Sequence, residues 1–561
     1  MSPAALLVAA LLAAAASASA PPEAQPPAGP LRGKWTATTS GRPIAAFEGI
    51  PYAAPPVGPL RFQSPVAAAP WSEVRVADRP GSMCLQRNIF LKVAHLEGSE
   101  DCLFINVYAP ETVSRAQPLP VLAWVHGGGF FAGVSHEYGP EFLLERDVIL
   151  VTFNYRLGPL GFLSTGDGVI AGNFGMKDQV QALRWVRENI RAFGGDADKV
   201  TIFGESAGAG SVHHLTISPL AKGLFHGAIA MSGSALSPWA FRPPRVAAEF
   251  AAKVAVAVGC PTDSGSEALR ECLMGKSAED IISTDLALYE WGAHPMCPFT
   301  VTAEPAGPGA FLDRHPAAAL AATPPSVPLV MGFVSHEGCV AAAPIITDPK
   351  LQKELDEKFV DIAPIIFHSK NLDKSINNAI FNKIRKFYFN DSAIDQTTKW
   401  DLTKMFSDHF FICSILESVK IQKQSSATSP VYLYDLAYLS KRSFAVAFGA
   451  EEAGSAMCHG DDLLLMFPLQ SMLPGEQSAA DKAIGKELID AIVTFASTGV
   501  PTRDGSWRPV QNALQPEYIH LPEAGKSSMR SGYEPERVAF WRDLPVNLAF
   551  AASDPPTRDE L

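Results

Sequence analysis

Residues 200–208 read Val-Thr-Ile-Phe-Gly-Glu-Ser-Ala-Gly, an apolar run that leads into a turn of small residues. The apolar run predicts a buried strand, and Gly204 and Gly208 allow a backbone bend sharp enough to expose the hydroxyl of Ser206. A serine presented in this way can attack a carbonyl group. The pattern Gly-x-Ser-x-Gly is by itself weak evidence for a nucleophilic serine, so other motifs in the chain have to support it.

Short apolar runs alternate with longer helical patterns on both sides of this turn. The candidate buried strands are Val121–Val125, Val148–Tyr155, Val200–Phe203, Ala228–Met231, Val327–Phe333 and Val431–Leu436. Helical spacing is found over Met176–Ile190 and in the apolar positions between Ile484 and Phe495. This alternation predicts an α/β fold in which helices cover both faces of a large, mostly parallel sheet.

The composition and charge narrow the class of protein. The chain has 561 residues, of which 47% are hydrophobic and 19% charged, and its formal net charge is −12. These values are typical of a globular protein with a substantial core. The acidic balance argues against a nucleic-acid partner, because phosphate neutralisation needs concentrated Lys and Arg. One domain is expected over residues 34–546, preceded by a Pro-rich leader at 21–33 that is expected to be extended and poorly packed.

Both ends of the chain carry features of the secretory pathway. Residues 4–16 are apolar, uncharged and too short to span a membrane, so residues 1–20 are interpreted as a signal peptide. No later segment qualifies as transmembrane. The tail, residues 547–561, ends in Arg558-Asp559-Glu560-Leu561, which resembles a retrieval signal of the endoplasmic reticulum. The predicted location is the lumen of that compartment, with a retrieval receptor as partner, and secretion is the alternative.

Eight cysteines in an oxidising compartment indicate disulfides. Cys84 and Cys102 could close one short loop, and Cys260 and Cys272 could close another. The other four have no evident partner and are expected to be buried thiols. They are Cys297, Cys339, Cys413 and Cys458.

The stretch 349–405 differs from its surroundings, because it is rich in Lys, Asn and Asp and has helical spacing. A solvated helical insertion over the sheet is the default interpretation. A lid that borders the substrate entrance is the alternative. The only N-glycosylation sequon begins at Asn390 within this stretch, and its use requires exposure.

Acyl transfer by a serine requires a nucleophile, a base, an acid that orients the base, and donors for the oxyanion. The sequence His126-Gly127-Gly128-Gly129-Phe130 directly follows a predicted strand. Successive glycines let backbone N–H groups approach an oxyanion closely, so Gly128 and Gly129 are predicted donors. Ser206 is the predicted nucleophile, and the N–H of Ala207, at the start of the next helix, is the predicted third donor.

Further motifs are distributed along essentially the whole mature chain. They are Phe47–Ala53, Pro55–Gly58, Arg61-Phe62, Glu100–Leu103, Asn154–Gly158, Gly172-Asn173, Asp178-Gln179, Phe193–Asp196, Ser232–Ala235 and His459–Leu463. With the serine turn they resemble the type-B carboxylesterases, the cholinesterase-like branch of the α/β-hydrolases, and the last motif is closest to arthropod carboxylesterases. The resemblance implies an α/β-hydrolase fold and hydrolysis of apolar carboxylic esters through an acyl-enzyme, without metal or organic cofactor.

Chain order in α/β-hydrolases places the acid and then the histidine after the nucleophile. Glu337 stands just past a predicted strand and precedes Gly338, and the family's acid occupies such a Glu-Gly pair. His459 lies in a loop after the next predicted strand and precedes Gly460. In this assignment His459 takes the proton from Ser206, and Glu337 fixes the tautomer of the imidazole.

The resemblance also implies supporting contacts around the site. Arg61 and Glu100 match a salt bridge that anchors the first disulfide loop, and the two short cysteine loops are expected to be bonded pairs. Glu205 resembles the residue that lines the base of the active-site gorge in this family. Its expected role is to stabilise the imidazolium or to order a water, with a hydrogen-bonded bystander as the alternative.

The chain departs from cholinesterases at three places. Cholinesterases hold a quaternary ammonium against a tryptophan of the first disulfide loop, whereas Phe90 is the only aromatic residue between Cys84 and Cys102. Choline esters are therefore not expected as substrates. A third family disulfide is missing, because Val538 stands where the partner of Cys413 would be. The tail lacks the apolar heptads that assemble a tetramer, so a monomer is expected.

Two other functions stay open at this stage. One is a dedicated hormone or pheromone ester hydrolase. The other is a catalytically silent binding or adhesion relative, since one fold can host unrelated functions. Such relatives usually lose the serine or its partners, and this chain has Ser206, Glu337 and His459.

Overall fold

The computed structural model describes residues 20–544 except 89–92, 94, 114–115, 391, 426–428 and 450–456. Residues 1–19 of the predicted signal peptide, the tail with its final tetrapeptide, and Phe90 lie outside the described residues. Within the described part of the chain, no helix is long and apolar enough to cross a membrane.

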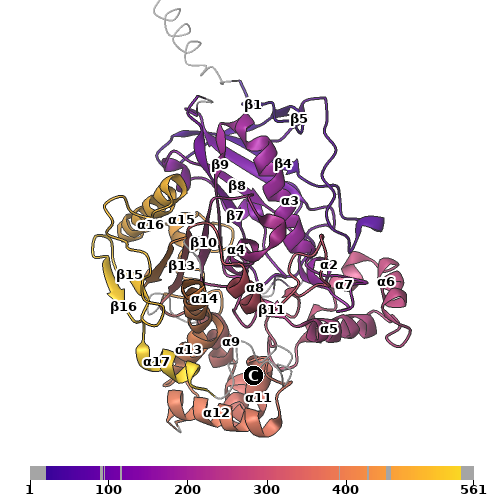
Figure 1. The fold of residues 1–561 in the computed structure, drawn as a ribbon, viewed down its shortest axis with the longest axis vertical. Helices are drawn as coiled ribbons and strands as arrows, with labels where there is room; N and C mark the ends of the chain where they lie inside the picture. The colour runs from indigo at the N-terminus through magenta and orange to yellow at the C-terminus, as the bar shows by residue number, and fades with distance from the viewer. Residues whose placement is uncertain are drawn as a thin grey trace, which may run out of the picture.

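An eleven-stranded sheet runs through the molecule (Figure 1). From one edge to the other its strands are β16 (Ser528–Ser531), β15 (Glu517–Leu521), β14 (Val431–Leu436), β13 (Leu329–Val334), β10 (Gly227–Met231), β9 (Gly195–Glu205), β7 (Leu119–Val125), β8 (Ile149–Phe153), β6 (Phe104–Pro110), β4 (Pro43–Pro51) and β3 (Lys34–Ala37). The strands from β15 to β8 pair in parallel, and the strands beyond them at both ends pair antiparallel. The predicted α/β class and all six predicted strands are confirmed.

Helices cover both faces of this sheet. Alternate residues of β7 point to opposite faces. Trp124 belongs to a core cluster with residues of α16 (Ala479–Thr498), whereas Ala123 belongs to a second cluster with residues of α3 (Phe174–Asn189) and α4 (Ala207–Ile217). Each face of the sheet therefore has its own apolar core, as a strand buried on both sides requires.

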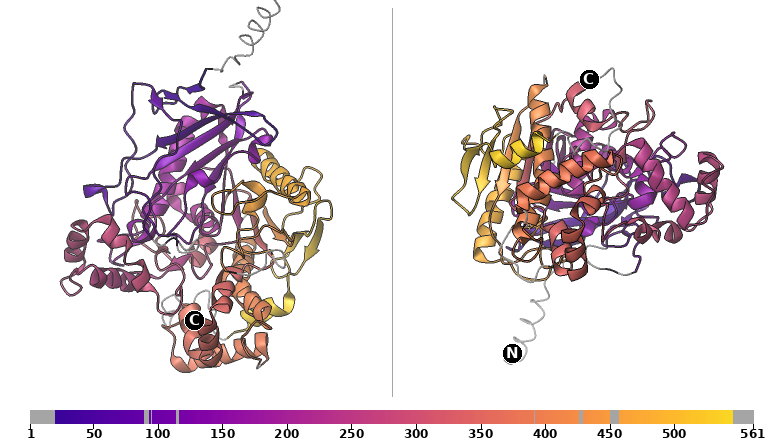
Figure 2. Two further views of the ribbon diagram at one scale, coloured as in Figure 1. Left: turned by 180° about the vertical axis from the view of Figure 1, so that it is seen from behind. Right: turned by 90° about the horizontal axis from the view of Figure 1, so that it is seen from below.

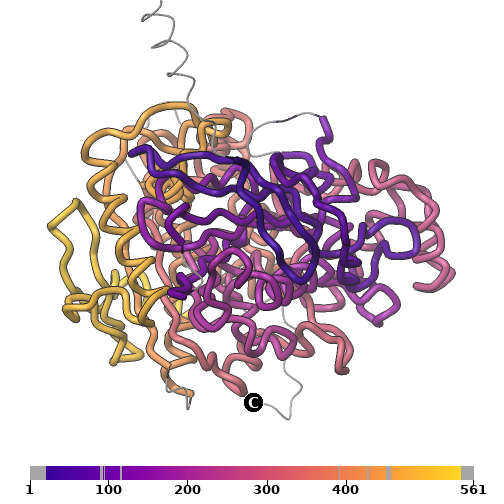
Figure 3. The backbone as a smooth tube through the Cα atoms, turned by 90° about the horizontal axis from the view of Figure 1, so that it is seen from above, coloured from indigo at the N-terminus to yellow at the C-terminus, as the bar shows by residue number. Residues whose placement is uncertain are grey.

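Further helices connect or follow these strands. They are α2 (Gly158–Phe162), α5 (Pro244–Ala257), α6 (Ser266–Met274), α7 (Ala278–Ile282), α8 (Pro316–Ala322), α9 (Cys339–Thr347), α14 (Cys413–Gln424), α15 (Leu463–Met466) and α17 (Pro535–Arg542). Helices α5 and α6 lie at the opposite side of the molecule from β15 and β16 (Figure 2). The same separation is visible from above, between the pink and the yellow parts of the chain (Figure 3).

The Pro-rich leader at 21–33 is packed, so the expectation that it is poorly packed is wrong. Strand β1 (Glu23–Ala24) pairs antiparallel with β2 (Leu31–Arg32). The N–H of Ala28 donates to the side chain of Asn189 at 2.9 Å. Buried and exposed residues alternate along the segment. The strand pairing satisfies backbone hydrogen-bonding groups of the leader. Its prolines and alanines form an apolar side, which its composition alone did not reveal.

The stretch 349–405 is helical, as its spacing predicted. It comprises α10 (Pro349–Glu357), α11 (Phe359–Ile366), α12 (Lys374–Phe389) and the first seven residues of α13 (Lys399–Ser407). Helix α12 lies at the end of the molecule opposite the N-terminal strands (Figure 1). Asn390 follows α12 directly and is exposed, so the sequon meets the condition for its use.

Candidate active site

Ser206 stands at a sharp turn between β9 and α4. Its φ of 59° and ψ of −123° lie outside the regions that a serine ordinarily occupies. Its N–H donates to the carbonyl oxygen of Met231 at 2.9 Å, which ties the turn to the neighbouring strand β10. A Cβ atom on Gly208 would lie 2.0 Å from the carbonyl oxygen of Val125. Only glycine therefore lets α4 approach β7 closely enough to hold the strained serine.

Three side chains predicted from distant parts of the sequence form one hydrogen-bonded chain. The Oγ atom of Ser206 lies 2.8 Å from Nε2 of His459. The Nδ1 atom of His459 lies 2.6 Å from Oε2 of Glu337. The other carboxylate oxygen of Glu337 accepts the N–H of Val334 at 2.9 Å. Glu337 is fully buried and His459 is 7% exposed, so their hydrogen bond is shielded from water, whereas Ser206 is half-buried.

The topology of the sheet explains why these residues meet. Ser206, Glu337 and His459 follow β9, β13 and β14, which belong to the parallel part of the sheet. Because the carboxyl ends of parallel strands meet at one edge, the loops that follow them converge there. The loop of His459 is longer than the other two, and a backbone bridge between His336 and Cys458 joins it to the loop of Glu337.

The glycine loop after β7 lies against the serine turn. Gly128 and Gly129 have φ values of 102° and 63°. A Cβ atom on Gly128 would lie 2.1 Å from the carbonyl oxygen of Ala132, so this position accepts only glycine. Gly128 and Gly129 line the same pocket as Ser206, while Ala207 is the first residue of α4. The loop thus has the position from which backbone N–H groups can bind an oxyanion.

A pocket of about 100 Å³ opens over the serine. Its apolar walls are Trp239, Met296, Cys297, Val340, Phe411, Phe444, Phe448, Leu463 and Met472. The ring of Phe411 lies 4.6 Å from the imidazole of His459, centroid to centroid. Within the described part of the chain, no residue of 349–405 lines this pocket. The sequence did not identify these wall residues, because they come from segments without a local motif.

Comparisons with known proteins identify relatives of this chain. The model of the carboxylesterase family matches residues 20–541. The chain belongs to the carboxylesterase family. It is 34% identical to venom carboxylesterase-6 of Apis mellifera, over 92% of this chain and 93% of that protein. It is 37% identical to esterase E4 of Myzus persicae, over 87% of this chain and 88% of that protein.

A solved structure extends the comparison to the fold. The juvenile hormone esterase of Manduca sexta, with OTFP covalently attached, superposes with a TM-score of 0.83 and 26% sequence identity. The match covers 93% of this chain and 99% of that one. The predicted α/β-hydrolase fold and the assignment to carboxylic ester hydrolases are therefore confirmed. The expected likeness to arthropod enzymes is confirmed by the insect relatives.

Glu205 of this carboxylesterase gives the base a second carboxylate neighbour. Its Oε1 atom lies 3.2 Å from Nε2 of His459. Burial raises the pKa of Glu205. Burial alone would lower the pKa of His459, but the carboxylates of Glu205 and Glu337 outweigh burial and raise that pKa. The site therefore stabilises the charged imidazolium that proton transfer from the serine would create.

Asp461 shapes the loop that carries His459. Its carboxylate accepts the Oγ–H of Ser443 at 2.6 Å, the N–H of Phe444 at 2.7 Å and the N–H of Cys458 at 2.8 Å. These bonds fold the loop around a buried carboxylate and fix the residue directly before the histidine. Asp461 lies within the motif His459–Leu463, but its role could not be predicted from sequence because its partners are set by tertiary structure.

Cys297 is a second possible nucleophile in the pocket. Burial raises the pKa of its thiol to about 12, so the thiol stays protonated near neutral pH. Since the thiolate is the reactive form of cysteine, this residue contributes packing and no nucleophile. Ser206 is the group that has a base within hydrogen-bonding distance.

Three disulfides stabilise the carboxylesterase. Cys84 bonds to Cys102 with an S–S distance of 2.07 Å, and Cys260 bonds to Cys272 with an S–S distance of 2.08 Å. The third joins two of the cysteines that were expected to be thiols, Cys339 and Cys458. That expectation is wrong for this pair, because the fold brings together positions 119 residues apart. The remaining two cysteines are free, and the first of them is Cys297.

Arg61 links the first disulfide loop to the segment that follows the second. Its Nε and Nη2 atoms donate to the two carboxylate oxygens of Glu100 at 2.5 and 2.7 Å. Its Nη1 atom donates to the carbonyl oxygen of Lys276, just after α6, at 2.6 Å. Both side chains of the ion pair are largely buried. The predicted partners are therefore in contact, and the contact reaches a second loop that the sequence did not indicate.

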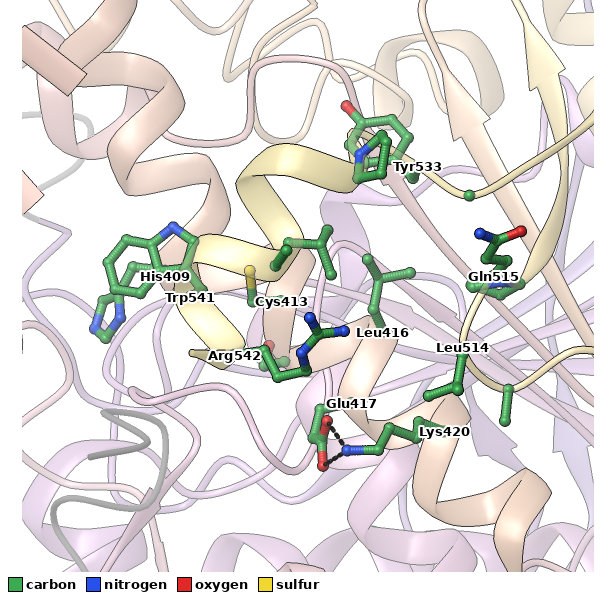
Figure 4. A pocket seen from close by; sticks show the side chains of 17 residues that line it. His409, Cys413, Leu416, Glu417, Lys420, Leu514, Gln515, Tyr533, Trp541 and Arg542 are labelled. Carbon is green, nitrogen blue, oxygen red and sulfur yellow. Dashed lines mark hydrogen bonds and ion pairs between the residues drawn. The ribbon is translucent and has the colours of Figure 1, made fainter. Parts of the chain in front are cut away.

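The other free cysteine, Cys413, lines a separate surface pocket of about 370 Å³ between α14 and α17. Figure 4 shows Trp541 and Cys413 toward one side of this view and Leu514 and Gln515 toward the other, with Leu416 between them. Val538 lines it as well, in agreement with the prediction that a valine replaces the partner of Cys413. This pocket shares no lining residue with the one above Ser206.

Proposed function

We propose that this carboxylesterase hydrolyses apolar carboxylic esters by a serine mechanism. Ser206 is the nucleophile, His459 is the general base and acid, and Glu337 orients the imidazole. The proposal rests on one observation above all, the continuous chain from Ser206 Oγ through both ring nitrogens of His459 to Glu337. A serine hydroxyl is a weak nucleophile unless a base is positioned to take its proton.

In the first half of the reaction, Ser206 Oγ attacks the carbonyl carbon of the ester while Nε2 of His459 accepts the hydroxyl proton. The carbonyl oxygen becomes an oxyanion that accepts hydrogen bonds from the N–H groups of Gly128, Gly129 and Ala207. The resulting imidazolium is stabilised by the carboxylate of Glu337. It then protonates the leaving alcohol as the ester C–O bond breaks, which leaves an acyl-serine.

The second half of the reaction repeats these roles with water in place of the serine. His459 takes a proton from water, and the hydroxide attacks the acyl carbonyl. The same backbone donors bind the second oxyanion. Collapse of this intermediate releases the carboxylic acid and returns the proton to Ser206, so the enzyme is regenerated without a change of its charge.

The apolar walls of the pocket support apolar esters as the substrate class. Trp239, Phe411 and Met296 offer no charged group to a substrate, and the pocket contains one buried acid, Glu205, beside the base. An apolar acyl or alcohol group gains free energy when it leaves water for such walls. Xenobiotic or lipid-like esters fit this description.

The mechanism is tested by labelling with a radioactive or fluorescent organophosphate. Its phosphorus reacts with an activated serine and leaves a stable adduct of known mass. Wild-type enzyme should label stoichiometrically, with the adduct on the peptide of Ser206, and Ser206→Ala should not label. Absence of labelling in a folded wild-type enzyme would refute the serine mechanism.

A dedicated hormone ester hydrolase is the second candidate. It is supported by the structural likeness to the juvenile hormone esterase of Manduca sexta. A panel of p-nitrophenyl and naphthyl esters of graded chain length, with juvenile hormone itself, separates the two. Comparable kcat/KM values across the panel favour a general esterase. A kcat/KM for juvenile hormone at least about 100-fold above that for every other ester would favour the dedicated enzyme. Apolar contacts alone can discriminate between substrates by about that factor.

We also propose that the protein resides in the lumen of the endoplasmic reticulum as a glycosylated monomer. Arg558–Leu561 would bind the retrieval receptor, and Asn390 would carry the glycan. Deletion of Arg558–Leu561 should move the enzyme into the medium of expressing cells. An unchanged intracellular pool after the deletion would favour another means of retention, and wild-type enzyme found in the medium would favour secretion.

A further inference from the structure

The loops that carry Glu337 and His459 are joined by a covalent bond. Cys339 lies two residues after Glu337, and Cys458 lies directly before His459. The disulfide between them spans 119 residues of sequence, and the two Cα atoms lie 5.7 Å apart. This separation is within the range that disulfides ordinarily have. No other disulfide of the enzyme touches the residues of the serine mechanism.

The acid is fixed independently of this bond. Glu337 accepts the N–H of Val334, at the end of β13, and the N–H of Gly338 donates to Ser407 of α13 at 2.8 Å. Cys339 then begins α9. Contacts on three separate elements thus determine where the carboxylate of Glu337 lies.

The loop that carries the histidine is held together, in its described part, by internal hydrogen bonds. His459 stands far beyond the end of β14, and α15 begins only after it, at Leu463. The N–H of His336 donates to the carbonyl oxygen of Met457 at 3.0 Å, and Asp461 holds the loop together from within. Among the described residues, the backbone pairing and the disulfide connect this loop to the loop of the acid, in addition to the hydrogen bond between His459 and Glu337 themselves.

We propose that Cys339 and Cys458 are positioning residues, whose disulfide holds the imidazole of His459 in register with Glu337 and Ser206. The proposal rests on the serine mechanism proposed above. A catalytic group displaced by about 1 Å can lose about 100-fold in rate. The bond removes such displacements at the residue adjacent to the base, and it does so without touching the substrate.

The disulfide between Cys339 and Cys458 is a permanent structural crosslink between the two loops, and is called the brace below. It forms when two thiols exchange with the disulfide of an oxidoreductase in the secretory pathway, which is reduced to a dithiol as the new S–S bond is made. Cys458 is fully buried and Cys339 is 6% exposed, so an external thiolate cannot reach either sulfur in the folded enzyme. The brace is therefore expected to resist thiol reagents under native conditions, unlike a redox switch.

The test compares two variants that each lack one disulfide. Cys339→Ala/Cys458→Ala removes the brace, and Cys260→Ala/Cys272→Ala removes a bond distant from the site as the matched control. Both are expected to lower the melting temperature. The first should lose about 10- to 100-fold in kcat with KM within about twofold of wild type. The control should keep kcat within about twofold. A brace variant that keeps wild-type kcat overturns the proposal.

A second measurement covers the case in which the brace variant does not fold. Wild-type enzyme is reduced stepwise in mild denaturant, returned to native buffer, and mapped by iodoacetamide labelling and mass spectrometry. Loss of activity should follow the appearance of thiols at Cys339 and Cys458. Full activity after both are reduced overturns the proposal, as does alkylation of both in the untreated native enzyme.

Organophosphate labelling separates this inference from the proposed function. If wild-type enzyme does not label, the serine mechanism itself fails. If wild type labels and the brace variant labels at the same rate, only the positioning role fails. The expected result is slow labelling of the brace variant, to the same final stoichiometry as wild type.

Discussion

Glu205 Oε1 lies 3.2 Å from Nε2 of His459, the same nitrogen that faces the hydroxyl of Ser206. The base is therefore placed between two carboxylates, since Glu337 holds its other nitrogen. Both carboxylates favour the charged imidazolium and raise the pKa of His459 against the effect of burial. Burial also raises the pKa of Glu205, and the charge of His459 acts in the opposite direction.

This relationship predicts the pH dependence of Glu205→Gln. His459 accepts a proton only when it is neutral, so kcat/KM should rise as the pH passes upward through the pKa of His459. Removing the charge of Glu205 removes support for the imidazolium, which lowers the pKa of His459. The acidic limb of the pH–kcat/KM profile should therefore shift to lower pH. The exposed change Asp198→Asn is the control, and a limb that stays in place or moves upward contradicts the assignment.

Gly208→Ala should damage both stability and catalysis. The added Cβ atom would lie 2.0 Å from the carbonyl oxygen of Val125, so α4 must move away from β7. Overpacking of this kind costs about 1–3 kcal/mol of unfolding free energy. The shift would carry Ser206 away from His459 and lower kcat by about 100-fold. Urea unfolding and steady-state kinetics measure the two effects.

The control for this prediction is Gly307→Ala, because a Cβ atom on Gly307 meets nothing within 4 Å. It should change the unfolding free energy by less than about 0.5 kcal/mol and leave kcat unchanged. Equal behaviour of the two variants would show that the close approach of α4 to β7 is not required for the serine turn.

The sequence predicted the parallel strands from β14 to β8, though not β15, and the hydrogen-bonded triplet for separate reasons. Strands β7 and β13 and residues 200–203 of β9 are apolar runs, which a strand covered on both faces needs. Ser206 followed from its Gly-x-Ser-x-Gly turn, and Glu337 and His459 followed from chain order together with the family resemblance. Local pattern and topology agree at these positions, so residues far apart in sequence could be placed together.

The rest of the fold depends on tertiary contacts that leave no local pattern. Strands β4 and β16 were not predicted. Pairing of β4 with β6 is interrupted by an irregularity between Phe47 and Ile50, and the residues of β16 are mostly exposed. The bond between Cys339 and Cys458 was missed for a similar reason, although each stands within two residues of a predicted catalytic residue. Their proximity follows from the convergence of two loops, which spacing along the chain does not encode.

The Arg61–Glu100 pair should contribute strongly to stability. The two side chains are 10% and 15% exposed, so Arg61→Ala leaves a carboxylate largely buried and unpaired. Such a change costs about 3–5 kcal/mol of unfolding free energy. The double variant Arg61→Leu/Glu100→Leu should recover part of this loss, because no isolated charge remains. Urea unfolding of both variants measures the difference.

A solvent-exposed pair provides the comparison. Arg191 and Asp198 have side chains that are 56% and 77% exposed. Arg191→Ala should cost no more than about 1 kcal/mol, since water screens the charges. If Arg61→Ala is as mild as Arg191→Ala, then the buried pair does not anchor the disulfide loops.

Met296→Ala should change which esters the enzyme prefers. Met296 lines the pocket above Ser206 together with Trp239, so its truncation leaves room for additional methylene groups of a substrate. One methylene in an apolar pocket changes kcat/KM by about 10-fold or more. The ratio of kcat/KM for p-nitrophenyl butyrate over acetate should rise by about that factor. Met529→Ala, on β16 and outside this pocket, should leave the ratio unchanged. The measurement is made first with esters that differ in the acyl group and then with esters that differ in the alcohol. If the ratio for Met296→Ala is unchanged in both series, bound esters do not contact Met296.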